Sequence, residues 1–292
     1  MRVFITGVKG FVGQELALQC EKQGIEAIGT DIADGDEHNY YKMDINSNNI
    51  TEIIPEGCDA IIHLAALSRD QDCKNNAVDC FRINVMGTLN LMEAAQQKGA
   101  KNFIFASTEW VYDSFLEGEI KDENSFIDIA KHKSEYAFSK LVSEGNLRQK
   151  YQHGFCNVTI LRFGIIYGPR KSNWSAVESL FHTVSTRDVV EVGSLKTGRC
   201  FIHVADIVKG VIKSIGLTGF HLINLQGDRL ITLGDIIEVS KRITEKNPSI
   251  VEKNPENISV RNVSNEKART VLNWEPEYNL EKGIESLIGT VA

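Results

Sequence analysis

MRVFITGVKGFVG occupies residues 1–13 and joins a short apolar run to a glycine-rich turn and the start of a helical pattern. Glycines in such a turn let backbone amides approach a pyrophosphate, and the positive N-terminus of the following helix stabilises the phosphate charge. The order strand, turn, helix is the context that a dinucleotide-binding turn requires, which favours this interpretation over an ordinary tight turn. We therefore expect a dinucleotide to contact Gly7, Gly10, Phe11, Val12 and Gly13.

Short apolar runs continue along the first two thirds of the chain and alternate with helix-periodic stretches. Runs this short and this apolar are typical of strands buried on both faces of a parallel sheet. Two helical stretches, 12–22 and 77–98, are each followed by a glycine where a C-terminal cap belongs. The pattern predicts an α/β fold with a doubly wound parallel sheet of the Rossmann type. The predicted strands are 2–5, 26–29, 60–64, 102–106 and 159–163.

The length of 292 residues allows either one elaborated domain or two. Beyond Tyr167 the apolar runs become sparser and polar helical stretches at 175–186, 233–245 and 265–272 dominate. We expect a dinucleotide-binding domain over residues 1–163 and a smaller, interleaved C-terminal lobe over 164–292 that mainly binds substrate. A segment near 196–225, with a strand at 221–225, is expected to return to the first domain.

Composition and charge exclude several classes of protein. Hydrophobic residues make up 42% of the chain, charged residues 24%, and the formal net charge is −7. This charge argues against a nucleic-acid or membrane partner, because both require a concentrated positive face. The chain opens directly on the first strand, and no apolar run approaches the roughly 20 residues of a membrane span, so we expect a cytoplasmic protein. No metal site or disulfide framework is expected from the six cysteines, which are Cys20, Cys58, Cys73, Cys80, Cys156 and Cys200.

The second predicted strand leads into Gly29-Thr30-Asp31. An acidic residue at this position accepts hydrogen bonds from the adenosine ribose hydroxyls and repels the additional phosphate of NADP. The alternative is a solvated loop carboxylate. We predict that Asp31 and the adjacent Ile32 contact the cofactor, and that the cofactor is NAD.

A tyrosine and a lysine lie four residues apart in Ser134-Glu135-Tyr136-Ala137-Phe138-Ser139-Lys140, so on a helix they share one face. Upstream, the strand pattern at 102–106 leads into Ser107 and Thr108 at the carboxyl edge, where open α/β sheets bind ligands. Together with the N-terminal turn, these residues predict one site.

With these motifs, the chain resembles the extended short-chain dehydrogenase/reductase superfamily, and within it the NAD-dependent nucleotide-sugar epimerase/dehydratase family of UDP-glucose 4-epimerase-like proteins. The resemblance extends over nearly the whole sequence. The matching positions are the glycine turn, Asp31, Asp44-Ile45, His63-Leu64-Ala65-Ala66, Asn84, Ser107-Thr108, Val111-Tyr112, Tyr136 with Lys140, Tyr167-Gly168-Pro169-Arg170, Arg199, Phe201-Ile202-His203-Val204, Asp206 and Leu272-Asn273-Trp274-Glu275-Pro276.

The resemblance implies that Tyr136 is the catalytic acid/base, that Lys140 binds the nicotinamide ribose and that Thr108 hydrogen-bonds the reacting hydroxyl. A free tyrosine has a pKa of about 10, so a pKa near 7 requires about 4 kcal/mol of phenolate stabilisation. The Lys140 ammonium and the positive nicotinamide ring are the expected sources. The alternative is a core tyrosine beside a solvated lysine.

Further binding positions follow from the same resemblance. Asp44 and Ile45 would flank the adenine, and Leu64, Ala65 and Ala66 would line the dinucleotide groove. His63 is expected to be a hydrogen-bonded strand histidine and not a ligand.

Two arginines, Arg199 and Arg261, would clamp a substrate diphosphate, a task suited to a planar bidentate donor. For Arg261 a solvated surface arginine is an equal alternative.

Several positions depart from the family pattern. Dehydratases of this family carry Asp-Glu after the catalytic threonine, whereas this chain has Glu109-Trp110. Because an indole is neither an acid nor a base, a dehydratase that needs both carboxyls is disfavoured. Ile165 stands where relatives place a substrate-contacting asparagine, and Asp113 and Cys200 replace a glycine and an aspartate. We expect Glu109 and Ile165 to contact the substrate.

Three functions remain open. The first is a nucleotide-sugar epimerase acting at carbon 4 through a transient ketone. The second is an NAD-dependent reductase or dehydrogenase of a nucleotide-linked or free keto sugar, which differs only in net turnover of NADH. The third is a non-catalytic protein that senses NAD.

A homodimer through the helices at 77–98 and 134–150 is expected by analogy with the family. The apolar positions of these helices suit either a dimer core or packing on the sheet. They are Val85, Leu89, Met92 and Leu141.

Overall fold

The computed structural model describes residues 1–290. Contacts divide the chain into two compact units. Unit 1 comprises residues 1–113, 126–162 and 208–223, and unit 2 comprises 114–125, 163–207 and the described residues from 224 onward. These bounds differ from the predicted division in two places. The segment 114–125 belongs to unit 2, because its strand pairs there, and the segment that returns to unit 1 is 208–223 instead of 196–225.

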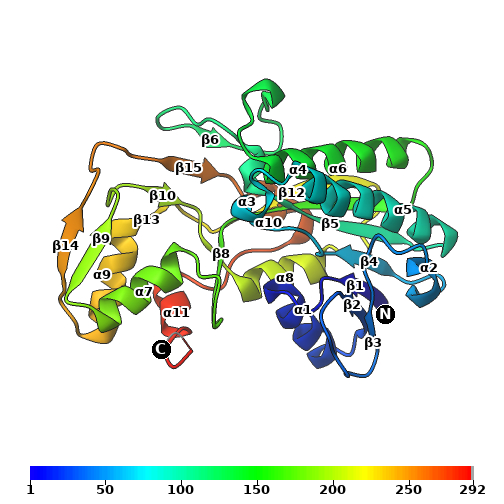
Figure 1. Cartoon of the computed structure of the whole chain (residues 1–292), viewed down its shortest axis with the longest axis horizontal. Helices are drawn as coiled ribbons and strands as arrows, with labels where there is room; N and C mark the ends of the chain where they lie inside the picture. The colour runs from blue at the N-terminus through cyan, green and yellow to red at the C-terminus, as the bar shows by residue number, and fades with distance from the viewer. Residues whose placement is uncertain (291–292) are drawn as a thin grey trace. The chain divides into compact units, whose positions relative to one another are not determined.

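The large sheet has seven strands within the described residues, in the order β12-β7-β5-β4-β1-β2-β3 (Figure 1). The neighbouring strands from β5 through β4, β1 and β2 to β3 pair in parallel. In this register, Val3 of β1 lies opposite Ala27 of β2 on one side and Ala60 of β4 on the other. The predicted doubly wound parallel sheet is confirmed, and the sequence pattern missed β3. The strands are β1 (Arg2–Thr6), β2 (Glu26–Asp31), β3 (Tyr40–Lys42), β4 (Ala60–His63), β5 (Asn102–Thr108), β7 (Asn157–Phe163) and β12 (Phe220–Leu225).

Helices cover both faces of this sheet, with α5 and α6 on one face and α1 on the other (Figure 1). The helix predicted over 77–98 is α4 and α5 joined by a π-helical turn at Arg82–Met86. Such turns insert an extra residue and occur frequently at functional sites. The helical segments of unit 1 are α1 (Phe11–Lys22), α2 (Ile50–Ile53), α3 (Asp70–Cys73), α4 (Ala77–Phe81), α5 (Gly87–Gln97) and α6 (Glu135–Gln152), with 3-10 turns η2 (Glu109–Val111) and η3 (Ile129–Lys131).

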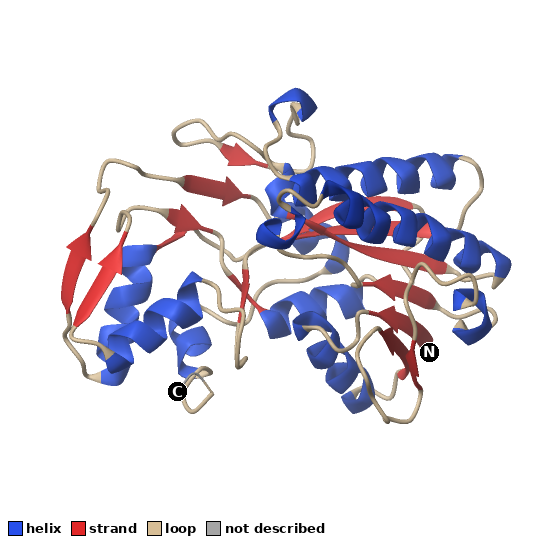
Figure 2. Cartoon of the chain, viewed as in Figure 1, coloured by secondary structure: helices blue, strands red, loops and turns tan. Residues whose placement is uncertain are grey.

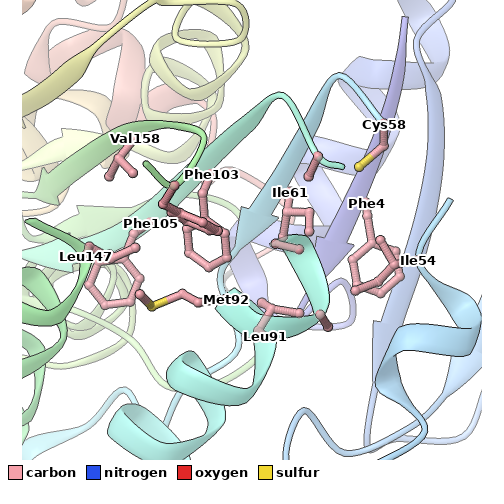
Figure 3. Close-up of a cluster of buried hydrophobic side chains, with 14 of the residues drawn as sticks. Phe4, Ile54, Cys58, Ile61, Leu91, Met92, Phe103, Phe105, Leu147 and Val158 are labelled. Atoms are coloured by element: carbon pink, nitrogen blue, oxygen red, sulfur yellow. The ribbon is translucent and has the colours of Figure 1, made fainter. Parts of the chain in front are cut away.

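A buried apolar cluster fixes α5 and α6 on the sheet (Figure 3). Phe4, Ile61 and Phe103 project from three strands toward Met92 of α5 and Leu147 of α6. Strands this apolar bury residues on both faces, which is why short runs of the sequence were sufficient to predict them.

The apolar positions considered for a dimer core lie mostly inside the protein. Val85 and Met92 are buried, and Leu89 packs against the same cluster. The predicted homodimer stays a prediction.

Unit 2 contains a four-stranded sheet among its described residues, in the order β13-β10-β15-β6 (Figure 2). Its helices α7 and α9 contribute Val177, Phe181 and Ile236 to a separate apolar core. Helix α8 (Val204–Lys213) begins in unit 2 and ends in unit 1. The other elements are β6 (Ile120–Lys121), β8 (Ile166–Tyr167), α7 (Ala176–Thr186), β9 (Val189–Val192), β10 (Gly198–Arg199), β11 (Ile202–His203), β13 (Ile231–Thr232), α9 (Leu233–Thr244), β14 (Ser249–Glu252), β15 (Val260–Val263), α10 (Glu266–Leu272) and α11 (Leu280–Glu285).

No helix within residues 1–290 has the length and apolar character needed to cross a membrane. In the same described range, no group of three or more His, Cys, Asp or Glu side chains is placed to hold a metal ion.

Replacing Phe103 by alanine tests the importance of the apolar cluster under α5 and α6. Phe103 is fully buried and its ring centroid lies 6.0 Å from that of His63 and 5.8 Å from that of Phe155. We expect Phe103→Ala to lower the free energy of unfolding by about 3–5 kcal/mol, measured by urea denaturation. Val78→Ala, at a position that is 81% exposed, is the control and should change it by less than about 0.5 kcal/mol.

Candidate functional site

The glycine turn after β1 has no room for side chains at two of its glycines. Gly7 has a φ of +72°, and a Cβ there would lie 2.6 Å from the backbone nitrogen of Ala65. A Cβ on Gly13 would lie 2.2 Å from the carbonyl oxygen of Gly7. Both contacts are far inside van der Waals distance, so the turn requires glycine at these positions. The chain therefore presents backbone at the beginning of α1.

The N-terminus of α1 is suited to hold a phosphate group. Gly10 is its N-cap residue, and within the described chain no side chain caps it and no acidic residue lies in its first turn. The partial positive charge at a helix N-terminus attracts anions. Phe11 and Val12, the first residues of this helix, are both half-buried. These residues fit the pyrophosphate of a dinucleotide.

Asp31, the last residue of β2, is tied to the same turn. Its Oδ2 accepts a hydrogen bond from the Lys9 backbone nitrogen at 3.0 Å, and its Oδ1 accepts one from the Ile32 nitrogen at 2.8 Å. A carboxylate offers about four acceptor positions, so this side chain can still accept ribose hydroxyls. The Ile32 side chain is 71% exposed.

The loop after β4 lies against the glycine turn. Leu64, Ala65 and Ala66 are half-buried, and the Ala65 nitrogen donates to Thr6 Oγ1 at 3.3 Å. The structure therefore brings these three predicted cofactor residues next to Gly7.

The other predicted adenine contacts differ in exposure. Asp44 is exposed and its Oδ1 accepts from the Asn46 nitrogen at 2.8 Å. Ile45 is buried, and its side chain packs so closely on α5 that a Cβ on Gly87 would lie 2.5 Å from Ile45 Cδ1.

His63 is a structural residue, as the sequence predicted. Its Nδ1 lies 2.8 Å from Thr6 Oγ1, and its Nε2 lies 2.9 Å from Thr88 Oγ1. Burial lowers the pKa of His63 to about 3, so the ring is neutral at physiological pH.

The structure brings Thr108 and Tyr136 together. Thr108 ends β5 and is buried, while Tyr136 lies in the first turn of α6. The Thr108 side chain lies close enough to the Tyr136 phenol to lower its pKa, and Thr108 Oγ1 accepts from the Trp110 nitrogen at 3.2 Å. The strand end thus places a hydroxyl beside the phenol.

The ionisation of Tyr136 in the protein without cofactor is controlled by its burial. Burial raises the pKa of Tyr136 to about 12, because desolvation of the phenolate outweighs the influence of Thr108. The neighbouring thiols of Cys73 and Cys80 raise the pKa further. Without a bound cofactor the Tyr136 side chain is therefore a neutral phenol, and the phenolate expected beside Lys140 and the nicotinamide ring stays a prediction.

Lys140 lies one helical turn beyond Tyr136. Its Nζ donates to the Ala106 carbonyl oxygen at 2.9 Å and lies 4.7 Å from the centroid of the Phe105 ring. Burial lowers the pKa of Lys140 to about 8, and the charges of Cys80, Cys73 and Glu144 only partly oppose this shift. The ammonium is therefore buried against β5, close to its titration range at neutral pH.

A buried ion pair lies on the same face of α6, and the sequence analysis missed it. Glu144 Oε2 accepts from Arg162 Nη2 at 2.6 Å, and Glu144 Oε1 accepts from Arg162 Nε at 3.0 Å and Ser107 Oγ at 2.5 Å. The only sequence signal is that Glu144 follows Lys140 by four residues. The pair ties together β5, α6 and β7.

Asn84 joins the cofactor loop to α6. Its Oδ1 accepts from the Leu67 nitrogen at 2.8 Å, while its Nδ2 donates to the Leu67 oxygen and to Ser139 Oγ, both at 3.0 Å. Asn84 lies in the π-helical turn, which gives that turn a positioning role.

The predicted substrate residues are distributed over both units. Glu109 directly follows Thr108 in unit 1 and is fully buried. Ile165 belongs to unit 2 and packs on its apolar core.

Arg199 and Arg261 of unit 2 lie opposite each other on β10 and β15. Arg199 Nη1 donates to the Gly198 oxygen at 2.7 Å and to the Ser259 oxygen at 2.6 Å. The structure therefore places the two predicted arginines side by side.

The sequence and the fold of this chain resemble those of known proteins. Residues 3–218 match the NAD dependent epimerase/dehydratase family. A UDP-glucuronate 4-epimerase from Thermodesulfobacterium geofontis is 26% identical, over 97% of this chain and 94% of its own length. UDP-glucuronic acid decarboxylase 1 from Arabidopsis thaliana is 28% identical, over 99% of this chain and 69% of its own length. The fold resembles that of UDP-glucose 4-epimerase from Thermotoga maritima with UDP-glucose, with a TM-score of 0.86, 23% identity, and 100% and 97% of the two chains covered.

Changing Asp31 to asparagine tests the cofactor assignment. We expect Asp31→Asn to weaken NAD binding about tenfold or more, since hydrogen bonds to a charged acceptor contribute about 1.5–3 kcal/mol. Discrimination against NADP should fall as well, because the repelling charge is removed. Calorimetric titration with both cofactors measures these effects. Asp36→Asn, an exposed carboxylate of the same loop, is the matched control; equal NAD affinity in the two variants would contradict the assignment.

Lys140 predicts a pH dependence of stability in the cofactor-free protein. Between pH 8 and 10.5 the unfolded chain holds the Lys140 proton and the folded chain does not, so the stability contributed by this residue rises with pH. Relative to Lys140→Met, wild type should gain up to about 3 kcal/mol across this window. Urea denaturation at several pH values measures the difference, and a constant difference would show that burial does not shift this pKa.

Proposed function

The chain belongs to the NAD-dependent epimerase/dehydratase family, and from this premise we propose that it is a nucleotide-sugar epimerase acting at carbon 4 through a transient ketone. The observation that carries the proposal is the position of the Thr108 side chain beside the Tyr136 phenol, at the carboxyl end of β5. A hydroxyl and a phenol held together can position and deprotonate a sugar hydroxyl. We take a UDP-linked hexuronate as the first substrate class, because the relative from T. geofontis is named a UDP-glucuronate 4-epimerase.

The residues of unit 1 fit the cofactor of the family. The turn with Gly7 and Gly13 would hold the pyrophosphate, Asp31 the adenosine ribose, and Lys140 the nicotinamide ribose. When bound, NAD supplies a hydride acceptor and a positively charged ring. This positive charge would oppose the burial that raises the pKa of Tyr136.

Tyr136 would carry the proton transfer. Its phenolate oxygen removes the proton of the carbon-4 hydroxyl, and the resulting phenol returns a proton to the ketone oxygen after the sugar has turned in the site. Thr108 would hold that oxygen by a hydrogen bond. Burial favours the neutral phenol of Tyr136, and this is the form that donates a proton to the ketone oxygen in the second half of the reaction.

Elimination and net reduction are less well supported. Trp110 occupies the position of the second dehydratase carboxyl, and its indole N–H is a donor without acid or base function. A reductase would use the same residues but would consume NADH, and a decarboxylase would release CO2. These products separate the reactions in a single assay.

Recognition of the substrate diphosphate is assigned to Arg199 and Arg261. Their positions opposite each other on β10 and β15 support this role, because paired guanidinium groups bind phosphates in a bidentate manner.

Replacing Tyr136 by phenylalanine tests the mechanism. Wild type incubated with UDP-glucuronate, and separately with UDP-glucose, should form a carbon-4 epimer of at least one of them, with no net NADH and no CO2. Tyr136→Phe should lower kcat/KM by about 10²- to 10⁴-fold while NAD affinity persists, because only the proton carrier is removed. Product analysis by NMR and absorbance at the NADH band measure both.

Tyr151→Phe, on the same helix, is the matched control and should retain activity. Equal rates for Tyr136→Phe and wild type would overturn the catalytic role. Formation of CO2 or stoichiometric consumption of NADH would overturn the epimerase assignment in favour of a decarboxylase or a reductase.

A further inference from the structure

Lys9 lies inside the glycine turn, one residue before the N-cap of α1. Its backbone nitrogen donates to Asp31 Oδ2 at 3.0 Å, so its side chain begins beside the carboxylate that we assign to the adenosine ribose. A lysine carries its charge at the end of a flexible four-carbon stem and is a common ligand of phosphate groups. Lys9 is therefore within reach of a phosphate on the 2′ oxygen of that ribose, the group by which NADP differs from NAD.

The loop between β2 and β3, at the edge of the large sheet, holds the Lys9 ammonium (Figure 1). Glu37 Oε1 accepts a hydrogen bond from Lys9 Nζ, and the centroid of the Tyr40 ring lies 4.6 Å from the same nitrogen. The ion pair packs on the backbone of Gly35, because a Cβ there would lie 2.7 Å from Lys9 Nζ and 2.6 Å from Glu37 Oε2. These contacts leave the Lys9 side chain only 22% exposed.

Tyr40 attaches this loop to the end of β2. Its hydroxyl donates to the Ala33 carbonyl oxygen and lies 3.3 Å from the carbonyl oxygen of Asp31. The ring that contacts the ammonium by cation–π attraction is thereby held next to Asp31. The engaged lysine and the ribose carboxylate consequently belong to one connected group of side chains.

Negative charge dominates the loop. Residues 31–37 contain four carboxylates, and Lys9 and Lys42 each pair with one of them. Lys42 Nζ donates to Asp34 Oδ1 at 2.6 Å, so the two ion pairs are separate. A phosphate monoester carries about −1.5 to −2 charges at pH 7 and is repelled by carboxylates that lie close to it.

We propose that Glu37 is a specificity-determining residue of the cofactor site, which withholds from NADP the only cation of the glycine turn by pairing with Lys9. The ribose hydroxyls of NAD need only the acceptor oxygens of Asp31, so the ion pair does not interfere with NAD. Against NADP, Glu37 acts twice: it occupies the ammonium, and it adds a like charge near the phosphate. The inference concerns the cofactor and does not rest on the proposed reaction at carbon 4.

Titration of the cofactor-free protein with NAD and with NADP tests Glu37→Gln. We expect NADP to bind the variant about tenfold more tightly than wild type, the effect of gaining one charge-assisted hydrogen bond. NAD affinity should stay close to that of wild type. Glu37 is 58% exposed, so its replacement leaves the apolar core undisturbed. Where NADP binds too weakly for direct calorimetry, its displacement of bound NAD gives the dissociation constant.

Asp34→Asn is the matched control, because it removes a carboxylate of the same loop but releases Lys42 instead of Lys9. It should raise NADP affinity far less than Glu37→Gln does. The double variant Lys9→Met/Glu37→Gln should lose the gain, since the turn then has no ammonium to bind the phosphate. Thermal unfolding checks that every variant is folded.

Equal NADP affinity of Glu37→Gln and Asp34→Asn would overturn the role of Glu37. A gain that persists in the double variant would overturn it as well, because the gain would then come from net charge alone. Both titrations are made without a sugar nucleotide, so their outcome is separate from the test of the proposed reaction.

Discussion

Two consecutive residues of β5 are hydrogen-bonded to helix α6 and the next one lies beside it, and this attachment positions the candidate catalytic side chains. The Ala106 oxygen accepts from Lys140, the Ser107 hydroxyl donates to Glu144, and the Thr108 side chain lies beside that of Tyr136. The three helix residues are spaced by four, so they lie on one face of α6. Because the whole of β5 is buried, the helix cannot shift along the strand without breaking buried hydrogen bonds. The local geometry of the site is therefore a property of the core.

Burial has different consequences for the charged groups on this helix face. Glu144 accepts two hydrogen bonds from Arg162, so the two buried side chains satisfy each other. Lys140 donates to a main-chain oxygen and its pKa falls to about 8. Tyr136 moves the other way, to a pKa of about 12. At neutral pH, Tyr136 is therefore a neutral phenol that can donate a proton, whereas Lys140 is an ammonium that loses its proton more easily than a free lysine. An additional positive charge near Tyr136 would be needed to ionise the phenol.

The sequence predicted the parts of the fold that follow from backbone geometry. The glycine turn could be predicted from its sequence because the backbone leaves no room for a Cβ at Gly7 and Gly13, so glycine must stand there. Buried strands such as β5 could be predicted because they are continuously apolar. The short strand β3 was missed, since its residues Tyr40–Lys42 lack an apolar pattern. The π-helical turn was missed as well, because its sequence continues the helical periodicity on both sides.

The site was predictable to a similar extent. The neighbouring positions of Thr108 and Tyr136 follow from a strand end and a helix start. The ion pair of Glu144 with Arg162 does not, because hydrophobic periodicity assigns charged residues to the surface, whereas tertiary contacts decide which charges are buried. The pKa of Tyr136 in the protein without cofactor could not be predicted either, because reasoning from pairs of charges omits desolvation, which is the largest cause of the shift.

In the proposed function, chemistry and anion recognition are carried by different units. The residues assigned to proton transfer, Thr108 and Tyr136, lie on β5 and α6 of unit 1. The two arginines that the proposed function assigns to the diphosphate lie on β10 and β15, strands of two and four residues. A short strand holds its side chains through sheet pairing with its neighbours, so a substitution there alters one contact to a ligand while the apolar core that fixes Tyr136 stays intact. Under the proposed function, such substitutions would therefore alter anion recognition without rebuilding the centre for proton transfer.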